Sequence, residues 1–158
     1  MKITSFSNPR QTILLTCRDK GKDNVMTLDW HMPLSFDPMM YAVSIGKSRF
    51  SLKLIQNSKV FVVNFIPKEM EKEAILCGRS SGRDIDKFEE FSIEKEEAKK
   101  VNCPRIKNAL AWLECEVEKE IETGDHILFI AKVVFAEKRK EGKRLFHLYL
   151  DKFTTTLE

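Results

Sequence analysis

A chain of 158 residues is long enough to bury a hydrophobic core without metal or disulfide support, and its length predicts a single domain. Its 27 basic and 24 acidic residues leave a net charge of only +3, which argues against a dedicated nucleic-acid-binding protein. No apolar run approaches the roughly 20 residues that cross a membrane, and the N-terminus lacks the apolar segment of a signal peptide, so we expect a cytoplasmic protein.

The N-terminal third alternates apolar and polar segments, which indicates a β-rich fold. Residues 11–17 and 25–30 are predicted to be two strands of a hairpin, joined by a turn rich in charged residues and glycine. Polar groups interrupt the second of these strands. Pro33 and Pro38 follow it, and they predict an extended loop. Residues 40–46 form a third predicted strand that ends at a glycine.

The middle of the chain predicts two helices around a strand. Residues 48–58 suit a short helix, and residues 60–65, VFVVNF, suit a strand in which Asn64 is the sole polar residue. Apolar residues at i, i+4 and i+7 predict a second helix over residues 68–78, ending at its glycine. A polar loop follows. Residues 89–100 are mostly charged, so we expect a solvated surface segment.

The C-terminal half returns to a two-residue period. Every even position from Glu114 to Glu122 is glutamate, which predicts a strand with one wet and one dry face. Residues 126–136 are nearly all apolar and predict a strand buried on both faces, and residues 145–150 predict a last strand. Six or seven strands, mostly in consecutive hairpins with two helical insertions, indicate an antiparallel barrel.

The four cysteines and three histidines do not indicate a metal site. The cysteines are far apart and include no C-x-x-C pair, and the histidines lack metal-ligand spacing. We therefore expect no metal and no disulfide framework. Cys17 and Cys115 are expected to be small buried hydrophobic residues.

Three short segments carry residues suited to a ligand. Residues 47–51, KSRFS, combine two cations and two hydroxyls at a helix start, which suits an anion, although a serine helix cap is a simpler alternative. Residues 77–88, CGRSSGRDIDKF, suit a phosphate or a polar chain, or a surface loop whose charges pair internally. Residues 124–126, GDH, place a histidine at a strand mouth, where a structural role is the commoner case.

These segments belong to a series of motifs that runs through nearly the whole chain. The series is N-x-M-T-x-x-W, P-x-S-F-x-P, S-R-F-S-x-K-L-I, F-V-V-N-F, C-G-x-x-S-G-R-D-x-D-K-F, L-E-C and G-D-H. It resembles the flavin reductase-like family, and more narrowly its flavoredoxin and archaeal ferric reductase branch. The resemblance implies a mainly β fold, a six-stranded antiparallel Greek-key split β-barrel with short helical insertions.

The resemblance also implies a function. It indicates a homodimer that binds FMN near the subunit interface and takes a hydride from NADH or NADPH. The final acceptor could be free flavin, a ferric complex or a partner protein. A non-enzymatic electron carrier or flavin storage protein would carry the same motifs, so that alternative stays open. A β-barrel nucleic-acid module is less favoured, because most phenylalanines lie within apolar strand patterns.

By the same resemblance, particular positions would contact the cofactor. Along the isoalloxazine ring would lie Met26, Thr27, Leu28, Asp29 and Trp30. The phosphate would meet Lys47, Ser48, Arg49 and Ser51. The pocket would be closed by Cys77, Gly78, Arg83 and Lys87. His126 would lie near the nicotinamide, as the candidate catalytic residue, or would support the barrel end.

The physical requirements of a flavin fit this assignment. Its ring needs an apolar wall and hydrogen-bond partners along one edge, which a strand with one free backbone edge supplies. Two positions depart from the family pattern: Asp29 replaces a small residue, and Ala131 stands where many relatives have glycine. We expect Cys77 to leave space for the ring rather than to act as a redox thiol, because a helix C-terminus does not stabilise a thiolate.

Overall fold

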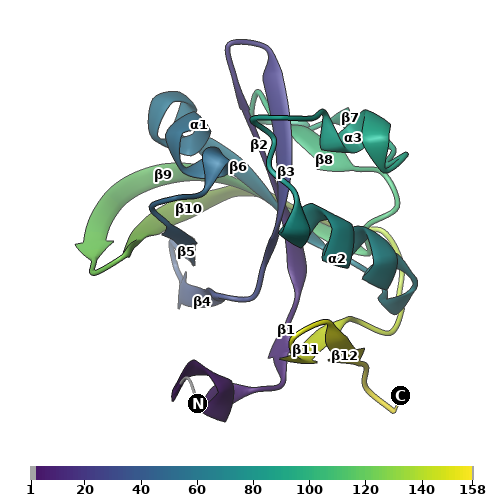
Figure 1. Ribbon diagram of the computed structural model, residues 1–158. Helices are drawn as coiled ribbons and strands as arrows, with labels where there is room; N and C mark the ends of the chain where they lie inside the picture. The colour runs from purple at the N-terminus through teal and green to yellow at the C-terminus, as the bar shows by residue number, and fades with distance from the viewer. Residues whose placement is uncertain (1–2, 158) are drawn as a thin grey trace.

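A seven-stranded antiparallel sheet forms the main body of the protein in the computed structural model, which describes residues 3–157 (Figure 1). The strands lie in the order β3-β2-β6-β9-β10-β5-β4. They are β2 (Ile13–Asp19), β3 (Lys22–Leu28), β4 (His31–Phe36), β5 (Met39–Gly46), β6 (Val60–Phe65), β9 (Ala111–Thr123) and β10 (His126–Lys138). The mainly β, antiparallel fold with short helices is therefore confirmed.

The two edges of this sheet are consecutive in the chain. β3 forms one edge and β4 the other, and only Asp29 and Trp30 separate them. Three peptide steps reach roughly 11 Å at most, so the sheet must curl until its edges meet. The Trp30 carbonyl accepts a hydrogen bond of 2.9 Å from the Ser44 amide of β5. The curled sheet encloses a core that contains the fully buried Phe61 and Phe129.

Two small sheets and several short helices surround the barrel. One sheet contains β1 (Arg10–Gln11), β11 (Phe146–Tyr149) and β12 (Lys152–Thr154), and the other β7 (Lys95–Glu97) and β8 (Pro104–Ile106). The helices are η1 (Ile3–Ser7), α1 (Phe50–Ser58), η2 (Lys68–Met70), α2 (Glu71–Arg79) and α3 (Lys87–Glu90). In Figure 1, α2 lies beside β3. Within residues 3–157, no helix combines the length and apolar character needed to cross a membrane.

Most predicted elements are present, with shifts at their ends. The strand predicted over residues 60–65 is β6. The predicted first strand is divided into β1 and β2, and the helix predicted to end at Gly78 continues to Arg79. β4 is a strand where we expected a loop around Pro33 and Pro38. An edge strand is hydrogen-bonded on one side only, so it tolerates a proline that would break a central strand.

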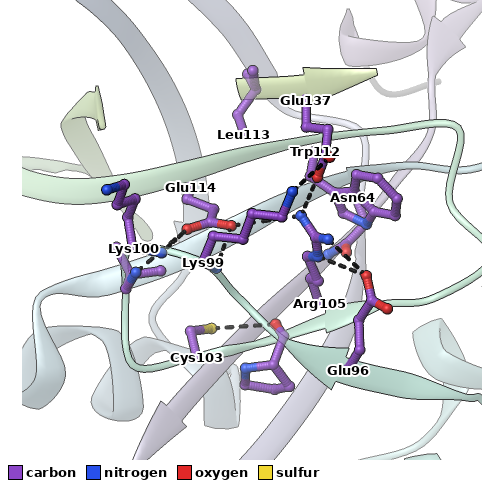
Figure 2. Close-up of polar contacts among 12 residues, drawn as sticks. Asn64, Glu96, Lys99, Lys100, Cys103, Arg105, Trp112, Leu113, Glu114 and Glu137 are labelled. Carbon is purple, nitrogen blue, oxygen red and sulfur yellow. Dashed lines mark hydrogen bonds and ion pairs between the residues drawn. The ribbon is translucent and has the colours of Figure 1, made fainter. Parts of the chain in front are cut away.

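The exposure predicted for the glutamate face of β9 is wrong at Glu114, which is completely buried. Figure 2 shows its carboxylate beside Lys99, Lys100 and Arg105. Its carboxylate accepts backbone hydrogen bonds from Lys99 (2.8 Å), Lys100 (2.6 Å) and Val101 (3.4 Å), and it lies 3.7 Å from Nη1 of Arg105. The segment before β8, expected to be solvated, therefore covers this part of the strand. A charged side chain tolerates burial when backbone donors and a cation surround it.

The burial predicted for β10 on both faces is also wrong. Only Phe129 and Ala131 are fully buried, and the other apolar residues of the strand are mostly half-buried. β9 and β10 are each 13 residues long, so their hairpin extends past the barrel body (Figure 1). The apolar composition of this strand therefore reflects partial burial along a projecting arm.

We predict that Glu114→Gln lowers the free energy of unfolding by about 2–3 kcal/mol. The amide cannot accept hydrogen bonds through its nitrogen, and the charge that opposes Arg105 is lost. Chemical denaturation measures the change. Glu118→Gln, on the exposed part of the same strand, is the matched control and should change stability by less than about 0.5 kcal/mol. Equal effects of the two substitutions would contradict the role assigned to Glu114.

Candidate flavin site

A cleft of about 400 Å³ lies between β3, the start of α1, the end of α2 and the turn between β11 and β12. This volume is in the range of pockets that hold small molecules. Most site residues predicted from the sequence line it: Met26, Thr27, Asp29, Ser48, Arg49, Ser51, Cys77, Gly78, Arg83 and Lys87. Three segments that are distant in the sequence therefore meet at one place.

Positive charge gathers at the end of the cleft where α1 begins. Arg49 immediately precedes the helix, and the Arg83 guanidinium donates a 3.1 Å hydrogen bond to the Ser48 carbonyl. The first N–H groups of a helix have no acceptor within it, and the helix dipole adds positive potential there. This end of the cleft is therefore suited to an anion, as the sequence predicted.

A buried hydrogen bond beside the start of α1 stabilises this end of the cleft. Asn24 is buried, and its Nδ2 donates a 2.8 Å hydrogen bond to the Ser51 hydroxyl. Gly82 lies against the same asparagine: a Cβ at this position would be 2.1 Å from Asn24 Oδ1. Only glycine lets the loop after α2 approach so closely, and this explains the glycine within the CGRSSGRDIDKF segment.

β3 forms the long wall of the cleft, and its backbone is partly free. It is an edge strand, so it pairs with β2 on one side only. The Val25 carbonyl points away from β2, because it accepts a 3.0 Å hydrogen bond from Nζ of Lys87. Backbone groups of alternate strand residues point the same way, so those of Thr27 also face the cleft side. This is the free strand edge that a flavin would require.

Lys87 is a buried cation that ties this wall together. It is 4% exposed, and its Nζ donates to the carbonyls of Val25 and of Cys77, the second at 2.8 Å. Burial lowers the pKa of its ammonium below the ordinary value, and the nearby Arg49 lowers it further, whereas Cys77 opposes this effect. The Cys77 carbonyl belongs to the last turn of α2, where carbonyls lack partners within the helix. Lys87 therefore fastens β3 to the C-terminus of α2.

Close packing between α2 and β3 leaves room only for small residues. The Thr27 hydroxyl donates a 2.5 Å hydrogen bond to the Ala74 carbonyl, and a Cβ at Gly78 would lie 3.5 Å from Cβ of Thr27. Cys77 is buried beside them, and burial raises the pKa of its thiol to about 12. A thiol with so high a pKa is protonated at neutral pH. This agrees with a residue that leaves space rather than one that reacts.

Four predicted site residues lie outside this cleft. Leu28 is packed in the barrel core, and the Lys47 ammonium pairs with Glu122. The ring of Trp30 stacks on that of His126, with centroids 4.5 Å apart, and borders a second, apolar cleft of about 380 Å³. Nδ1 of His126 lies 2.6 Å from the Asp125 carboxylate. Asp29 borders both clefts, so Trp30 and Asp29 separate them.

The sequence did not predict the C-terminal part of the site. The sheet of β1, β11 and β12 contributes His147, Leu150, Asp151 and Phe153 to the cleft lining. Nδ1 of His147 lies 2.7 Å from Oδ2 of Asp29, a residue 118 positions earlier in the chain. No local sequence pattern predicts such a contact, because it depends on how the sheet of β1, β11 and β12 packs against the barrel. The unexpected carboxylate at Asp29 was the only available signal.

Comparison with known proteins identifies the family. The flavin reductase like domain matches residues 5–156. The chain belongs to the flavin reductase-like family. An uncharacterized protein from Archaeoglobus fulgidus is 43% identical over 125 residues, which cover 77% of this chain and 71% of that protein.

Structures of the family share the fold described above. The flavoredoxin from Methanosarcina acetivorans superposes with a TM-score of 0.90 at 26% identity, covering 100% of this chain and 90% of that one. An FMN-binding protein from Thermus thermophilus with bound 1-cyclohex-2-enone superposes with a TM-score of 0.89 at 22% identity. It covers 98% of this chain and 90% of that chain, and at this identity the likeness concerns the fold alone. The split β-barrel expected from the sequence is therefore confirmed.

We predict that Cys77 resists thiol alkylation in the folded protein. With a pKa of about 12, only about one thiol in ten thousand is ionised at pH 8, and the side chain is buried as well. The ionised fraction rises only as the pH approaches 12. Labelling at pH 8 should therefore be negligible in the folded protein, and complete after unfolding, because unfolding removes the burial that raises the pKa. Mass spectrometry of iodoacetamide-treated protein measures both states. Rapid labelling of Cys77 in the folded chain would refute this assignment.

Proposed function

We propose that this chain is an FMN-binding oxidoreductase that uses NADH or NADPH to reduce a further acceptor. The arrangement of cations in the cleft carries the proposal. Arg49 and Arg83 meet the N-terminus of α1 at one end of a cleft whose long wall is an edge strand. A cleft of this shape fits a ligand that has a phosphate at one end and a flat ring that lies along the strand.

The phosphate end would be held by residues around the start of α1. Arg49 and the Ser48 hydroxyl border the cleft, and Arg83 is held there by its bond to the Ser48 carbonyl. Ser51 is fixed by Asn24 beneath the helix start. These groups match one terminal phosphate, which is the reason to propose FMN.

The ring end would be bounded by β3 and α2. Met26 supplies apolar surface, and the outward backbone groups of Thr27 supply hydrogen bonds. On the opposite side of the cleft, Gly78 and Cys77 are small residues, so they leave room for a flat ring between helix and strand. When bound, the flavin would supply the hydride chemistry, accepting from the nicotinamide and passing electrons to free flavin, a ferric complex or a partner protein. The chain's own contribution is to position and shield the cofactor.

Anaerobic titration of the flavin-loaded protein tests this function. Loss of the oxidised flavin absorbance on adding NADH or NADPH supports a reductase. A flavin that stays oxidised with both donors, but accepts electrons from dithionite, would show that the chain is an electron carrier or storage protein instead. Protein that binds no flavin at all would refute both assignments.

The cysteines support a location for the protein as well. All four are free and buried. Unpaired cysteines are usual where the surroundings keep thiols reduced. We therefore include a cytoplasmic location in the proposal.

We predict that Arg49→Ala weakens FMN binding by roughly tenfold or more and leaves riboflavin binding nearly unchanged. A hydrogen bond to a charged group contributes about 1.5–3 kcal/mol, and only FMN carries the phosphate. Fluorescence titration with both ligands measures the difference.

Lys47→Ala is the matched control, because Lys47 lies in the same turn but outside the cleft and pairs with Glu122. It should change the affinity for either ligand by less than about twofold. Equal losses of FMN and riboflavin affinity in Arg49→Ala would place this guanidinium away from the phosphate.

We further propose that the protein is a homodimer. Around β4, large apolar side chains are exposed: Met32, Leu34, Phe36 and Met39. Met32 also borders the apolar cleft beside Trp30, and exposed apolar surface of this kind marks interaction sites. A second copy covering this surface would shield both β4 and the cleft beside the flavin site.

We predict that Phe36→Lys produces a monomer that stays folded. Phe36 is fully exposed, so its replacement removes little packing within one chain but places a charge in the proposed interface. Light scattering and circular dichroism measure assembly and folding. Leu157→Lys, which alters an equally exposed residue near the chain end, should remain dimeric. A wild-type protein that is monomeric at micromolar concentration would contradict the proposal.

A further inference from the structure

The turn between β11 and β12 places a leucine where hairpins usually have glycine or asparagine. Tyr149 pairs with Lys152, so Leu150 and Asp151 form a two-residue hairpin loop. The favoured loops of this length need a positive φ at their first residue. Leu150 occupies that position with φ of +50°, in the left-handed region that is unfavourable for a leucine.

Leu150 differs from the other residues that adopt this conformation. Among residues 3–157, the other non-glycine residues with positive φ are the polar Lys20, Lys59 and Ser92. Leu150 is apolar and 87% exposed, so it gains little packing within the chain that would offset its backbone conformation. Residues held in unfavourable backbone conformations are concentrated at functional sites. The fold by itself therefore does not explain the leucine.

Exposure alone would not be informative, because single exposed apolar residues are normal on protein surfaces. Leu157 is such a residue: it is 96% exposed and does not border the cleft. Leu150, in contrast, lines the candidate flavin cleft. It does not border the second, apolar cleft near β4, so it lies apart from the proposed dimer surface.

Leu150 lies at the end of the flavin cleft that is opposite to α1. Asn24 of β3 bonds to Ser51 at the start of α1, whereas Asp29, just after β3, lies 2.7 Å from the His147 ring of β11. A strand rises about 3.3 Å per residue, so these two ends of the β3 wall are roughly 16 Å apart. Figure 1 shows the same separation, with β11 and β12 below α2 and α1 at the opposite side of the molecule.

Contacts within the protein hold the turn in place around the leucine. Asp151 forms an ion pair with Arg79 of α2, and the half-buried Phe153 of β12 packs against a buried apolar cluster. Nε2 of His147 donates a 2.9 Å hydrogen bond to the Leu150 carbonyl. The backbone of the turn is therefore anchored on both sides, while the leucine side chain stays free at the rim of the cleft.

We propose that Leu150 is a ligand-contact residue that covers the apolar part of a ring bound in the cleft. The polar edge of a flavin suits the free backbone groups of β3, but its dimethylbenzene part needs apolar cover. Packing Leu150 on that part removes apolar surface of both groups from water, and this stabilises the complex. The identity of the ring as a flavin rests on the proposed function.

Two substitutions separate the side chain from the backbone conformation. Leu150→Asn keeps a similar volume and suits the left-handed conformation better than leucine does, but it replaces the apolar surface with an amide. Leu150→Met is the matched control, because it keeps an apolar side chain of similar volume at the same backbone conformation.

Fluorescence titration with FMN and with riboflavin tests the contact. Leu150→Asn should weaken the binding of both ligands by about tenfold, equivalent to about 1.4 kcal/mol. The ratio of the two affinities should stay unchanged, because Leu150 lies far from the phosphate end, whereas Arg49→Ala should change that ratio. Leu150→Met should bind both ligands within about twofold of wild type. An unchanged affinity in Leu150→Asn, or a loss confined to FMN, would overturn the proposal.

Measurements on flavin-free protein exclude a role in folding or assembly. Because Leu150 is exposed and strained, Leu150→Asn should unfold at the same urea concentration as wild type or at a higher one. Its size by light scattering should also be unchanged. A lower unfolding midpoint, or a change in assembly, would assign the leucine to the fold or to an interface and would overturn the proposal.

The same titrations distinguish this inference from the proposed function. Wild-type protein that binds neither FMN nor riboflavin would refute the proposed function, and with it the ligand assigned to Leu150. Wild-type protein that binds both, together with a Leu150→Asn variant that binds them equally well, would overturn this inference and leave the proposed function intact.

Discussion

Two residues connect the opposite edges of the main sheet, and this short connection governs the rest of the architecture. β3 and β4 follow each other in the chain with only Asp29 and Trp30 between them, although five strands separate them in the sheet. A flat sheet could not satisfy this connection, so the sheet closes into a barrel. Closure leaves β3 as an edge strand, free on the side where α2 packs and the cleft forms.

The same connection divides the surface into two environments. Asp29 borders both clefts, whereas Trp30 borders the apolar one, where its ring stacks on His126. The polar cleft offers backbone groups and cations, and the apolar cleft is bordered by Met32, one of the exposed apolar side chains of β4. The proposed cofactor site and the proposed assembly surface therefore lie next to each other, because one dipeptide separates them.

Charge inside the polar cleft is organised by pairing. Its two carboxylates already have partners within the chain, Asp29 with the His147 ring and Asp151 with the Arg79 guanidinium. Arg49 and Arg83, in contrast, are not among the ion pairs found in residues 3–157, so their charge is available to an incoming anion. Lys87 is buried beneath them and fixes strand to helix. The acids of the cleft thus connect parts of the protein to one another, while Arg49 and Arg83 at the start of α1 face the open cleft.

The sequence by itself determined the elements whose pattern is local, such as β6 and α1, because side-chain periodicity and composition act over a few residues. Motifs in series also identified most of the cleft, from Met26 to Lys87. Only the tertiary structure decided that Glu114 is buried: its place in the glutamate pattern predicts exposure to solvent, but residues 99–101 cover it. It also decided that Trp30 turns away from the cleft and that His147 enters it. Those outcomes depend on contacts between residues far apart in the chain, and such contacts leave no trace in local periodicity.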